Sequence, residues 1–364
     1  MFEDIEVKAY STMQETQLKY WEKIRHPFVA GLELTSVCNM RCVHCYMSDA
    51  EKKIGLSTEE WKRVIDRLYE AGVLILYMTG GEIFTRKDFL EIYLYAKKKG
   101  FIIELLTNAT LLNEEIIEAF KIYPPATVSI SVYGMTAQTY ESVTTISGSF
   151  QKFYENVKKL YEADIDIELK FIGLKTNVQD FALAEAFAQE LGVKFKYNFE
   201  IFPTLQGGKE GLNYRLSNED IVDFEINYPN AAKVIAANVL KKNPFLKAEQ
   251  IPVFTCNVAS TLCYIDSNGF VSPCNKMRLK KYNVLEVPLA TIWEDYIKEY
   301  ANMLAPKSYK CAKCSYIHIC SPCPVINKLS TGDYVIPCAE YCELTMLRAK
   351  EFSKEKYNIY RTTK

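Results

Sequence analysis

Apolar and polar positions alternate in blocks along the first two hundred residues. Short apolar runs predict strands at 28–34, 73–79, 101–107, 126–132, 165–174 and 193–201. The stretches between them predict helices at 57–71, 86–99, 113–122, 136–143, 149–163 and 179–191. Strand–helix alternation repeated in this way predicts parallel βα units.

The predicted strands appear apolar on both faces, as in Val73–Leu76, which is typical of parallel strands covered by helices. Six βα units fit an open or partial barrel of the TIM type, or a doubly wound sheet. In both folds ligands bind where the strands end, at their carboxyl edge. We therefore expect the residues that follow each strand to share one site.

The sequence is further divided into a barrel and the segments that flank it. Residues 1–27 predict a capping helix, and 28–201 the barrel. The strand–helix alternation ends in residues 202–250, where Gly207-Gly208 predicts a loop. Residues 217–241 then predict a helix, so the segment 202–250 is interpreted as a helical linker. We expect a small cysteine-rich α+β domain over 251–345 and a helical tail over 346–364.

Composition and charge limit the classes of protein to which the chain could belong. The chain has 364 residues, a net charge of −1, 49% hydrophobic and 24% charged residues. This balance gives no sign of a nucleic-acid or anionic-membrane partner. The acidic N-terminus lacks a signal pattern, and no apolar run reaches the roughly 18 residues of a membrane span. We expect a cytoplasmic protein with reduced thiols.

Three cysteines follow the first predicted strand in the spacing C-x3-C-x2-C: Cys38, Cys42 and Cys45. Three thiolates on one short loop suit one metal centre. A [4Fe–4S] cluster normally takes four cysteines, so three would leave one iron open, as a catalytic zinc keeps one position open. The alternative interpretation is a zinc or redox cysteine cluster.

Nine further cysteines lie between residues 256 and 342, after a long segment that contains none. Asn268-Gly269 predicts a hairpin flanked by Cys263 and Cys274. Cys311-x2-Cys314 and Cys320-x2-Cys323 also fit a zinc ribbon. Nine cysteines exceed one zinc site, whereas eight would fill two four-cysteine clusters with one left over.

Taken together, the first cysteine motif, Gly80-Gly81-Glu82 and the late cysteine array resemble a radical S-adenosylmethionine (SAM) enzyme with a C-terminal SPASM domain. The resemblance covers roughly residues 28–350. It implies that Cys38, Cys42 and Cys45 hold a [4Fe–4S] cluster whose open iron binds SAM. In this family, reductive cleavage of SAM yields a 5′-deoxyadenosyl radical, which takes a hydrogen from the substrate.

The resemblance also implies SAM contacts. His44 occupies the position before the third cysteine, and Tyr46 is expected near the adenine. Gly80, Gly81 and Glu82 match the segment that meets the methionyl amine. Ser131 matches a ribose contact and Asn108 is a nearby candidate, although either residue is also a common strand-end cap.

One position departs from the family. Thr144 stands where many relatives carry an arginine that pairs with the SAM carboxylate. Lys170, in an apolar strand, is the replacement candidate, because a lysine there is costly unless it is paired. The alternative is that Lys170 extends outward to solvent.

In the SPASM region, the resemblance implies two auxiliary [4Fe–4S] clusters. One would be held by Cys256, Cys263, Cys274 and Cys323, and the other by Cys311, Cys314, Cys320 and Cys342. The Cys320–Cys323 spacing is one residue short of the usual pattern. Cys342 is chosen over Cys338 because Tyr341–Leu344 resembles the closing segment of the family, which leaves Cys338 as the spare thiol.

The leading hypothesis for the reaction is maturation of a ribosomally made peptide, with a thioether or carbon–carbon crosslink formed after hydrogen abstraction. The alternatives are a sulfatase-type formylglycine maturase and a small-molecule or haem-pathway radical SAM oxidoreductase. Asn275 weakens the sulfatase alternative, because those enzymes carry an aspartate there and an amide cannot accept a proton at neutral pH. A zinc-stabilised binding protein is the non-enzyme alternative.

Expected partners are a peptide substrate and a flavodoxin- or ferredoxin-type electron donor. Only 37 residues precede Cys38, too few for the recognition domain of many peptide maturases. We therefore expect peptide recognition to come from a separate protein or from residues 202–250.

Overall fold

The computed structural model describes residues 25–47, 52–239, 241, 250–256, 258–320 and 322–360. The predicted capping helix within residues 1–27 lies almost wholly outside the described residues. From residue 25 the chain builds one eight-stranded sheet in the order β6-β5-β4-β3-β2-β1-β7-β8.

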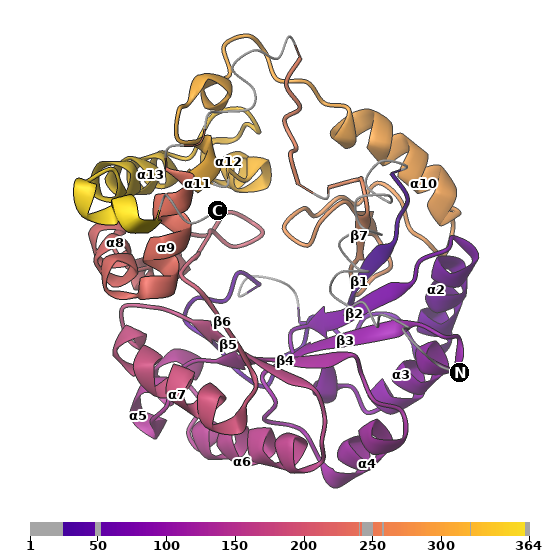
Figure 1. The fold of residues 1–364 in the computed structure, drawn as a ribbon. Coiled ribbons are helices and arrows are strands. Elements are labelled where there is room, and N and C mark those ends of the chain that lie inside the picture. Colours follow the sequence, from indigo (N-terminus) through magenta and orange to yellow (C-terminus); the bar gives the residue numbers. More distant parts are fainter. Residues whose placement is uncertain are drawn as a thin grey trace, which may run out of the picture.

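The six predicted strands are present in the predicted order. They are β1 (Val29–Thr35), β2 (Ile75–Gly80), β3 (Ile102–Thr107), β4 (Thr127–Val132), β5 (Ile167–Ile172) and β6 (Lys194–Asn198). Each pairs in parallel with its neighbour in the chain. The sheet curves into an arc with the helices on its outer side (Figure 1), which confirms the partial barrel and not the doubly wound alternative.

The outer layer consists of α2 (Thr58–Glu70), α3 (Phe89–Lys98), α4 (Glu114–Ile122), α5 (Ala137–Thr144), α6 (Ser149–Glu162) and α7 (Phe181–Leu191). Capping residues determine where several of these helices begin. Ser57 and Glu60 form a capping box at α2, and Asn113 caps α4 by accepting from the Ile116 amide. The helix expected from residue 86 begins three residues later, because a 3₁₀ turn (η1, Ile83–Thr85) and Arg86–Asp88 precede it.

The two faces of the sheet differ, contrary to the expectation that the strands are apolar on both. Buried and half-buried positions alternate along β3 and β4. Leu105 and Val128 pack on the helix side, whereas the strand registers place Glu104, Ser129 and Lys170 together on the inner face. The expectation was wrong because helices cover only the outer face of a barrel, so the inner face accepts polar residues.

The hairpin of β7 (Leu262–Ile265) and β8 (Val271–Ser272) joins this sheet. β7 pairs in parallel with β1, and β8 is antiparallel to β7. The main hydrophobic core continues from the barrel into Val253, Ile265 and Trp293. The proposed cysteine-rich unit at 251–345 therefore packs against the barrel as a continuation of its core.

The rest of the chain is helical. It comprises α8 (Asn218–Asn227), α9 (Pro229–Asn238), α10 (Leu289–Tyr296), α11 (Ile317–Cys320), α12 (Pro324–Thr331) and α13 (Ala339–Phe352), with short turns η2 (Val178–Asp180), η3 (Glu210–Tyr214), η4 (Ile297–Ala301), η5 (Lys310–Lys313) and η6 (Glu355–Tyr360). The helix expected at 217–241 is broken in two at Pro229. None of the described helices has the length and apolar character needed to cross a bilayer.

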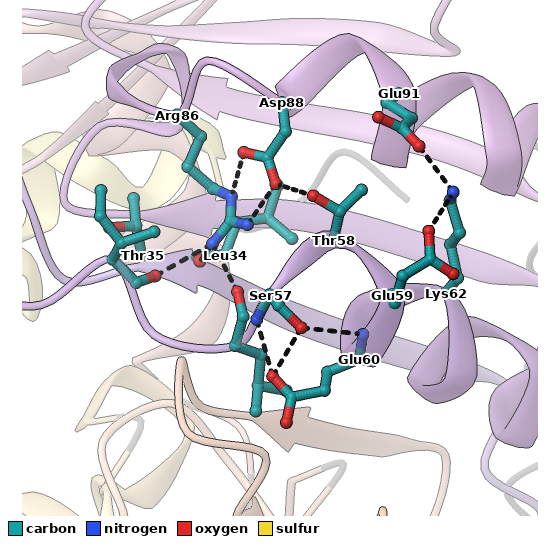
Figure 2. Close-up of polar contacts among 12 residues, drawn as sticks. Leu34, Thr35, Ser57, Thr58, Glu59, Glu60, Lys62, Arg86, Asp88 and Glu91 are labelled. Carbon is teal, nitrogen blue, oxygen red and sulfur yellow. Dashed lines mark hydrogen bonds and ion pairs between the residues drawn. The ribbon is translucent and has the colours of Figure 1, made fainter.

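Arg86 ties the turn after β2 to neighbouring segments. Its side chain is almost fully buried, and its Nη1 donates to the carbonyls of Leu34, Ile54 and Leu56 at 3.0 Å each. Figure 2 shows the guanidinium also bonded to the Asp88 carboxylate, which accepts from Thr58 as well. One cation therefore links the end of β1, the start of α2 and the start of α3.

We expect Arg86→Leu to lower the free energy of unfolding by about 3 kcal/mol or more, because buried carbonyls and a carboxylate lose their partner. The midpoint of anaerobic urea unfolding measures this change. Lys62→Leu is the matched control: Lys62 pairs with Glu59 and Glu91 on the surface (Figure 2), and we expect little change. Equal shifts for the two variants would contradict the role assigned to Arg86.

Candidate functional site

The cysteine loop lies directly beyond the carboxyl end of β1. Its backbone is anchored on one side to the end of α5, because the amides of Arg41 and Val43 donate to the carbonyls of Thr144 and Val143 at 3.1 and 3.0 Å. Thr144 is buried, and its hydroxyl pairs with Ser149. Position 144 therefore supports the loop in this chain through its backbone.

The other side of the loop contacts the turn that follows β2. The Gly81 amide donates to the Thr35 carbonyl, and the Glu82 amide donates to the Val37 carbonyl, both at 2.8 Å. A Cβ atom on Gly81 would lie 2.3 Å from the Val37 oxygen, and one on Gly80, whose φ is +152°, would lie 2.3 Å from the Thr35 oxygen. Glycine is required here because two backbones touch.

A cavity of about 300 Å³ opens between these segments and the ends of β3 and β4. It is lined by nearly all of the residues expected to contact the cluster and SAM: Cys38, Cys42, Cys45, His44, Tyr46, Gly80, Gly81, Asn108 and Ser131. The structure thus brings together residues spread over almost one hundred positions of the sequence, at the predicted edge of the sheet.

The three cysteines are half-buried and line the cavity together. Burial raises the pKa of Cys38 to about 11, and the neighbouring Glu82 and Cys45 raise it further. Burial also raises the pKa of Cys42, with added contributions from Cys45 and Cys38. The raised pKa values of Cys38 and Cys42 fit a metal centre, since a bound metal deprotonates a coordinating thiol.

His44 places a neutral imidazole in the wall of the cavity, where it can accept a hydrogen bond. Burial lowers the pKa of its imidazole to about 4, so the ring carries no charge at neutral pH. Its Nδ1 atom is buried and has no hydrogen-bond partner among the described residues. An orphaned buried nitrogen in the wall of this cavity fits a site completed by a bound group.

Glu82 lies behind the cavity and not in its wall. Its buried carboxylate accepts hydrogen bonds from the Thr107 hydroxyl at 2.6 Å, the Asn108 amide at 2.8 Å and the Phe84 amide at 3.2 Å. Burial raises the pKa of Glu82, and these bonds oppose the rise. The side chain therefore holds the turn after β2 against the end of β3, so a direct contact with the methionyl amine stays only a prediction.

Asn108 and Ser131 both line the cavity. The Asn108 Nδ2 donates to Asn39 Oδ1 at 3.0 Å, and its Oδ1 accepts from the Thr110 hydroxyl and amide. Asn108 thus connects the end of β3 to the cysteine loop. Ser131 pairs across the sheet with Lys170, which lies on the same inner face.

Lys170 itself is half-buried and does not line the cavity. Its side chain makes no hydrogen bond or ion pair within the described residues. Two other cations, Lys52 and Arg41, do line the cavity, and sequence reasoning missed them. Arg41 donates to the Cys38 and Met40 carbonyls, and Lys52 to the Met47 carbonyl. Arg41 lies inside the cysteine motif and Lys52 shortly after it, and this position in the sequence could have identified them as cavity residues.

The later thiols fall into two groups. The pKa values of Cys256 and Cys274 are raised first by burial and then by the Cys323 thiolate. Cys263 is fully buried on β7, and the pKa of Tyr77 is raised first by burial and then by the Cys263 and Cys274 thiolates. Cys263 lies on β7 and Cys274 follows β8, so these two thiols flank the β7–β8 hairpin.

The second group lines a cavity of about 770 Å³ with four thiols: Cys311, Cys314, Cys320 and Cys342. Burial raises the pKa of Cys320, and the other three thiolates add to the rise. Cys338 does not line this cavity, but it lines a smaller one with Cys311, Cys320, Cys323 and Cys342, and its thiol donates to Glu340 Oε2 at 2.9 Å. The ligand assignment stays a prediction.

Within the described residues, no three His, Cys, Asp or Glu side chains are close enough to hold a single metal ion. A four-iron cluster is larger than one ion and takes its cysteines from further apart.

Comparison with known proteins identifies two domains. Residues 32–186 match the model of the radical SAM superfamily, and residues 256–324 match the SPASM iron–sulfur cluster-binding domain. Both domains were predicted from the cysteine motifs, and they imply binding of SAM and iron–sulfur clusters.

Among curated proteins, the chain is 27% identical to the AdoMet-dependent heme synthase of Methanosarcina barkeri, over 85% of this chain and 94% of that protein. It is 32% identical to the subtilosin biosynthesis protein AlbA of Bacillus subtilis, over 48% of this chain and 39% of AlbA. The structure of Streptococcus suis SuiB bound to S-adenosylmethionine matches with a TM-score of 0.70 and 17% identity, covering 92% of this chain and 82% of SuiB. The SuiB match supports the fold.

Gly81→Ala should displace the cysteine loop, because the added Cβ meets the Val37 carbonyl. We expect the anaerobically reconstituted variant to lose about four irons per chain, the content of one cluster. Iron and acid-labile sulfide are measured against Gly211→Ala, whose Cβ would lie 3.3 Å from the His44 Cα and should be better tolerated. Full iron content in Gly81→Ala would show that the glycine is dispensable.

Proposed function

Because the chain carries a radical SAM domain followed by a SPASM domain, we propose that it cleaves SAM reductively and abstracts a hydrogen from a peptide substrate. A thioether or carbon–carbon crosslink in a ribosomally made peptide would follow. The observation that supports this proposal is the meeting of Cys38, Cys42 and Cys45 with the Gly80-Gly81 turn in one cavity. A bound [4Fe–4S] cluster would supply the electron that breaks the sulfonium bond of SAM.

The residues of this chain have separate tasks in the proposal. The three thiolates hold the cluster, and the orphaned Nδ1 of His44 accepts a hydrogen bond from the bound cofactor. Ser131 and Asn108 contact the ribose, and Tyr46 covers the adenine side of the cavity. Glu82 positions the glycine turn. Lys170 or Lys52 neutralises the SAM carboxylate, since both are cations near the cavity without a carboxylate partner within the described residues.

The auxiliary sites are part of the same proposal. Two further [4Fe–4S] clusters are assigned to the thiol groups of Cys256, Cys263, Cys274 and Cys323 and of Cys311, Cys314, Cys320 and Cys342. They would take up the second electron of the reaction. A flavodoxin or ferredoxin would supply the first electron, and a separate protein would assist recognition of the peptide.

A second candidate is radical chemistry on a small molecule of the haem pathway. It is favoured by the relatives named haem synthases, which the chain matches over most of both lengths. The peptide-modifying relatives match over smaller shares of their lengths, as for PqqA peptide cyclase of Rhodopseudomonas palustris at 70%. Product analysis with a peptide and with a tetrapyrrole separates the two candidates.

A formylglycine-forming reaction is disfavoured by the chemistry of Asn275. The Asn275 side chain lies beside the hydroxyl of Tyr46, whose pKa is raised by burial and lowered in part by Asn275. It occupies the position at which a base is expected for that reaction, and an amide cannot take a proton at neutral pH.

Changing Cys38, Cys42 and Cys45 to Ala should abolish formation of 5′-deoxyadenosine from SAM under reducing, anaerobic conditions. The wild-type chain should hold about twelve irons, as three four-iron clusters require, and the triple variant about eight. Cys338→Ala is the matched control and should keep the iron content of the wild type. Zinc without acid-labile sulfide in the wild type would contradict the proposal.

A further inference from the structure

Another cavity, of about 540 Å³, is distinct from the SAM cavity and from the 770 Å³ cavity lined by four thiols. We call it the second cavity. The loops after β5 and β6 form one side of it, and the start of α8 forms another. The end of α12 and the start of α13 close it from the C-terminal part of the chain. Figure 1 shows α8 and α13 next to each other beside the open end of the barrel.

Positive charge dominates the lining of this cavity. Lys175, Lys209 and Arg215 face it, and Glu340 is the one acidic residue in its wall. Within the described part of the chain, none of the three cations forms an ion pair. The Arg215 guanidinium is held by neutral acceptors, Asn218 Oδ1 at 2.7 Å and the Leu216 carbonyl at 3.2 Å. Its charge is therefore fixed in place, and Glu340 is the acidic residue of the wall that interacts with it and with Lys209.

Two helix N-termini add to this field. Ser217, the N-cap of α8, and Cys338, the N-cap of α13, both line the cavity. The N-terminus of a helix carries a partial positive charge and favours anions. The Glu340 carboxylate accepts from the Cys338 thiol and offsets only part of the positive charge of Lys175, Lys209 and Arg215. The cavity is therefore built to receive a negative group from outside.

The cavity adjoins the SAM site through one pair of aromatic rings. Phe202 lines the second cavity, and its ring centroid lies 5.6 Å from that of Tyr46, which lines the SAM cavity. The Leu205 amide also donates to the Tyr46 carbonyl at 3.0 Å. A group bound in the second cavity would be close to the SAM site but separated from the radical by this wall.

We propose that this cavity binds the carboxylate of an acidic residue in the peptide substrate, a residue other than the one that is modified. The proposal rests on the proposed function. An extended peptide advances about 3.3–3.6 Å per residue, so a few residues can place one side chain at SAM and another beyond Phe202.

The test measures binding to the cluster-loaded enzyme with SAM present under anaerobic conditions. The probes are two short fluorescein-labelled peptides of equal length, one alternating glutamate with glycine and the other glutamine with glycine. Fluorescence anisotropy should show the glutamate peptide binding at least about tenfold more tightly, because charged hydrogen bonds to a carboxylate are lost in the amide.

A triple variant, Lys175→Gln with Lys209→Gln and Arg215→Gln, should lose this preference. The matched control removes the same charge from exposed lysines on the outer helices, through Lys98→Gln, Lys152→Gln and Lys233→Gln, and should keep it. Equal binding of the two peptides to the wild type would overturn the proposal, as would an unchanged preference in the first variant.

A third arm compares coproporphyrin III with its tetramethyl ester. Preference for the free acid that depends on Lys175, Lys209 and Arg215, without preference for the glutamate peptide, would replace the peptide by a tetrapyrrole and overturn the proposal. Formation of 5′-deoxyadenosine by the wild type is measured separately. Its absence would refute the proposed function, whereas the binding result alone decides what the second cavity binds.

Discussion

The contact between the cysteine loop and the turn after β2 is the constraint on which the site depends. Two backbone hydrogen bonds hold these segments together, and the approach is so close that a Cβ at Gly80 or Gly81 would overlap a carbonyl oxygen. The loop carries the three thiols, and the turn completes the cavity beside them. The buried side chains of Arg86 and Glu82 fix this turn from behind, each by several hydrogen bonds. The geometry of the thiols is therefore set by backbone packing at the ends of parallel strands.

The segment from residue 201 to residue 217 connects the barrel to the C-terminal helices. One side of it touches the cysteine loop, where Gly211 packs against the His44 backbone and Leu205 bonds to Tyr46. Its other side lines the positively charged cavity. The same short segment thus separates the place of the radical from the place where we propose a substrate carboxylate binds. Because both sites contact this segment, the structure of the cofactor site affects where the substrate lies.

Much of the fold followed from simple patterns. The six parallel strands, the partial barrel and the edge at which the site forms were predicted from apolar runs and from the residues that follow them. The domain types were predicted from cysteine spacing, because few other arrangements use three thiols in that order with a glycine-rich turn. The two-sided apolar strands were predicted wrongly, since periodicity in short apolar runs does not reveal which face a helix covers. Residues such as Glu104 and Lys170 are accepted in the sheet because the inner face of the barrel is left without a helix.

By itself, the amino-acid sequence determined which elements form and which residues carry the chemistry, because strand periodicity, helix caps and cysteine spacing are local properties. Tertiary structure alone decided that Glu82 points away from the cavity, that Lys52 and Arg41 line it, and that β7 extends the barrel sheet. It also decided that Lys175, Arg215 and Glu340 meet around one cavity. These facts depend on contacts between segments far apart in the chain, and the direction in which a side chain points there is set by packing that no local pattern encodes.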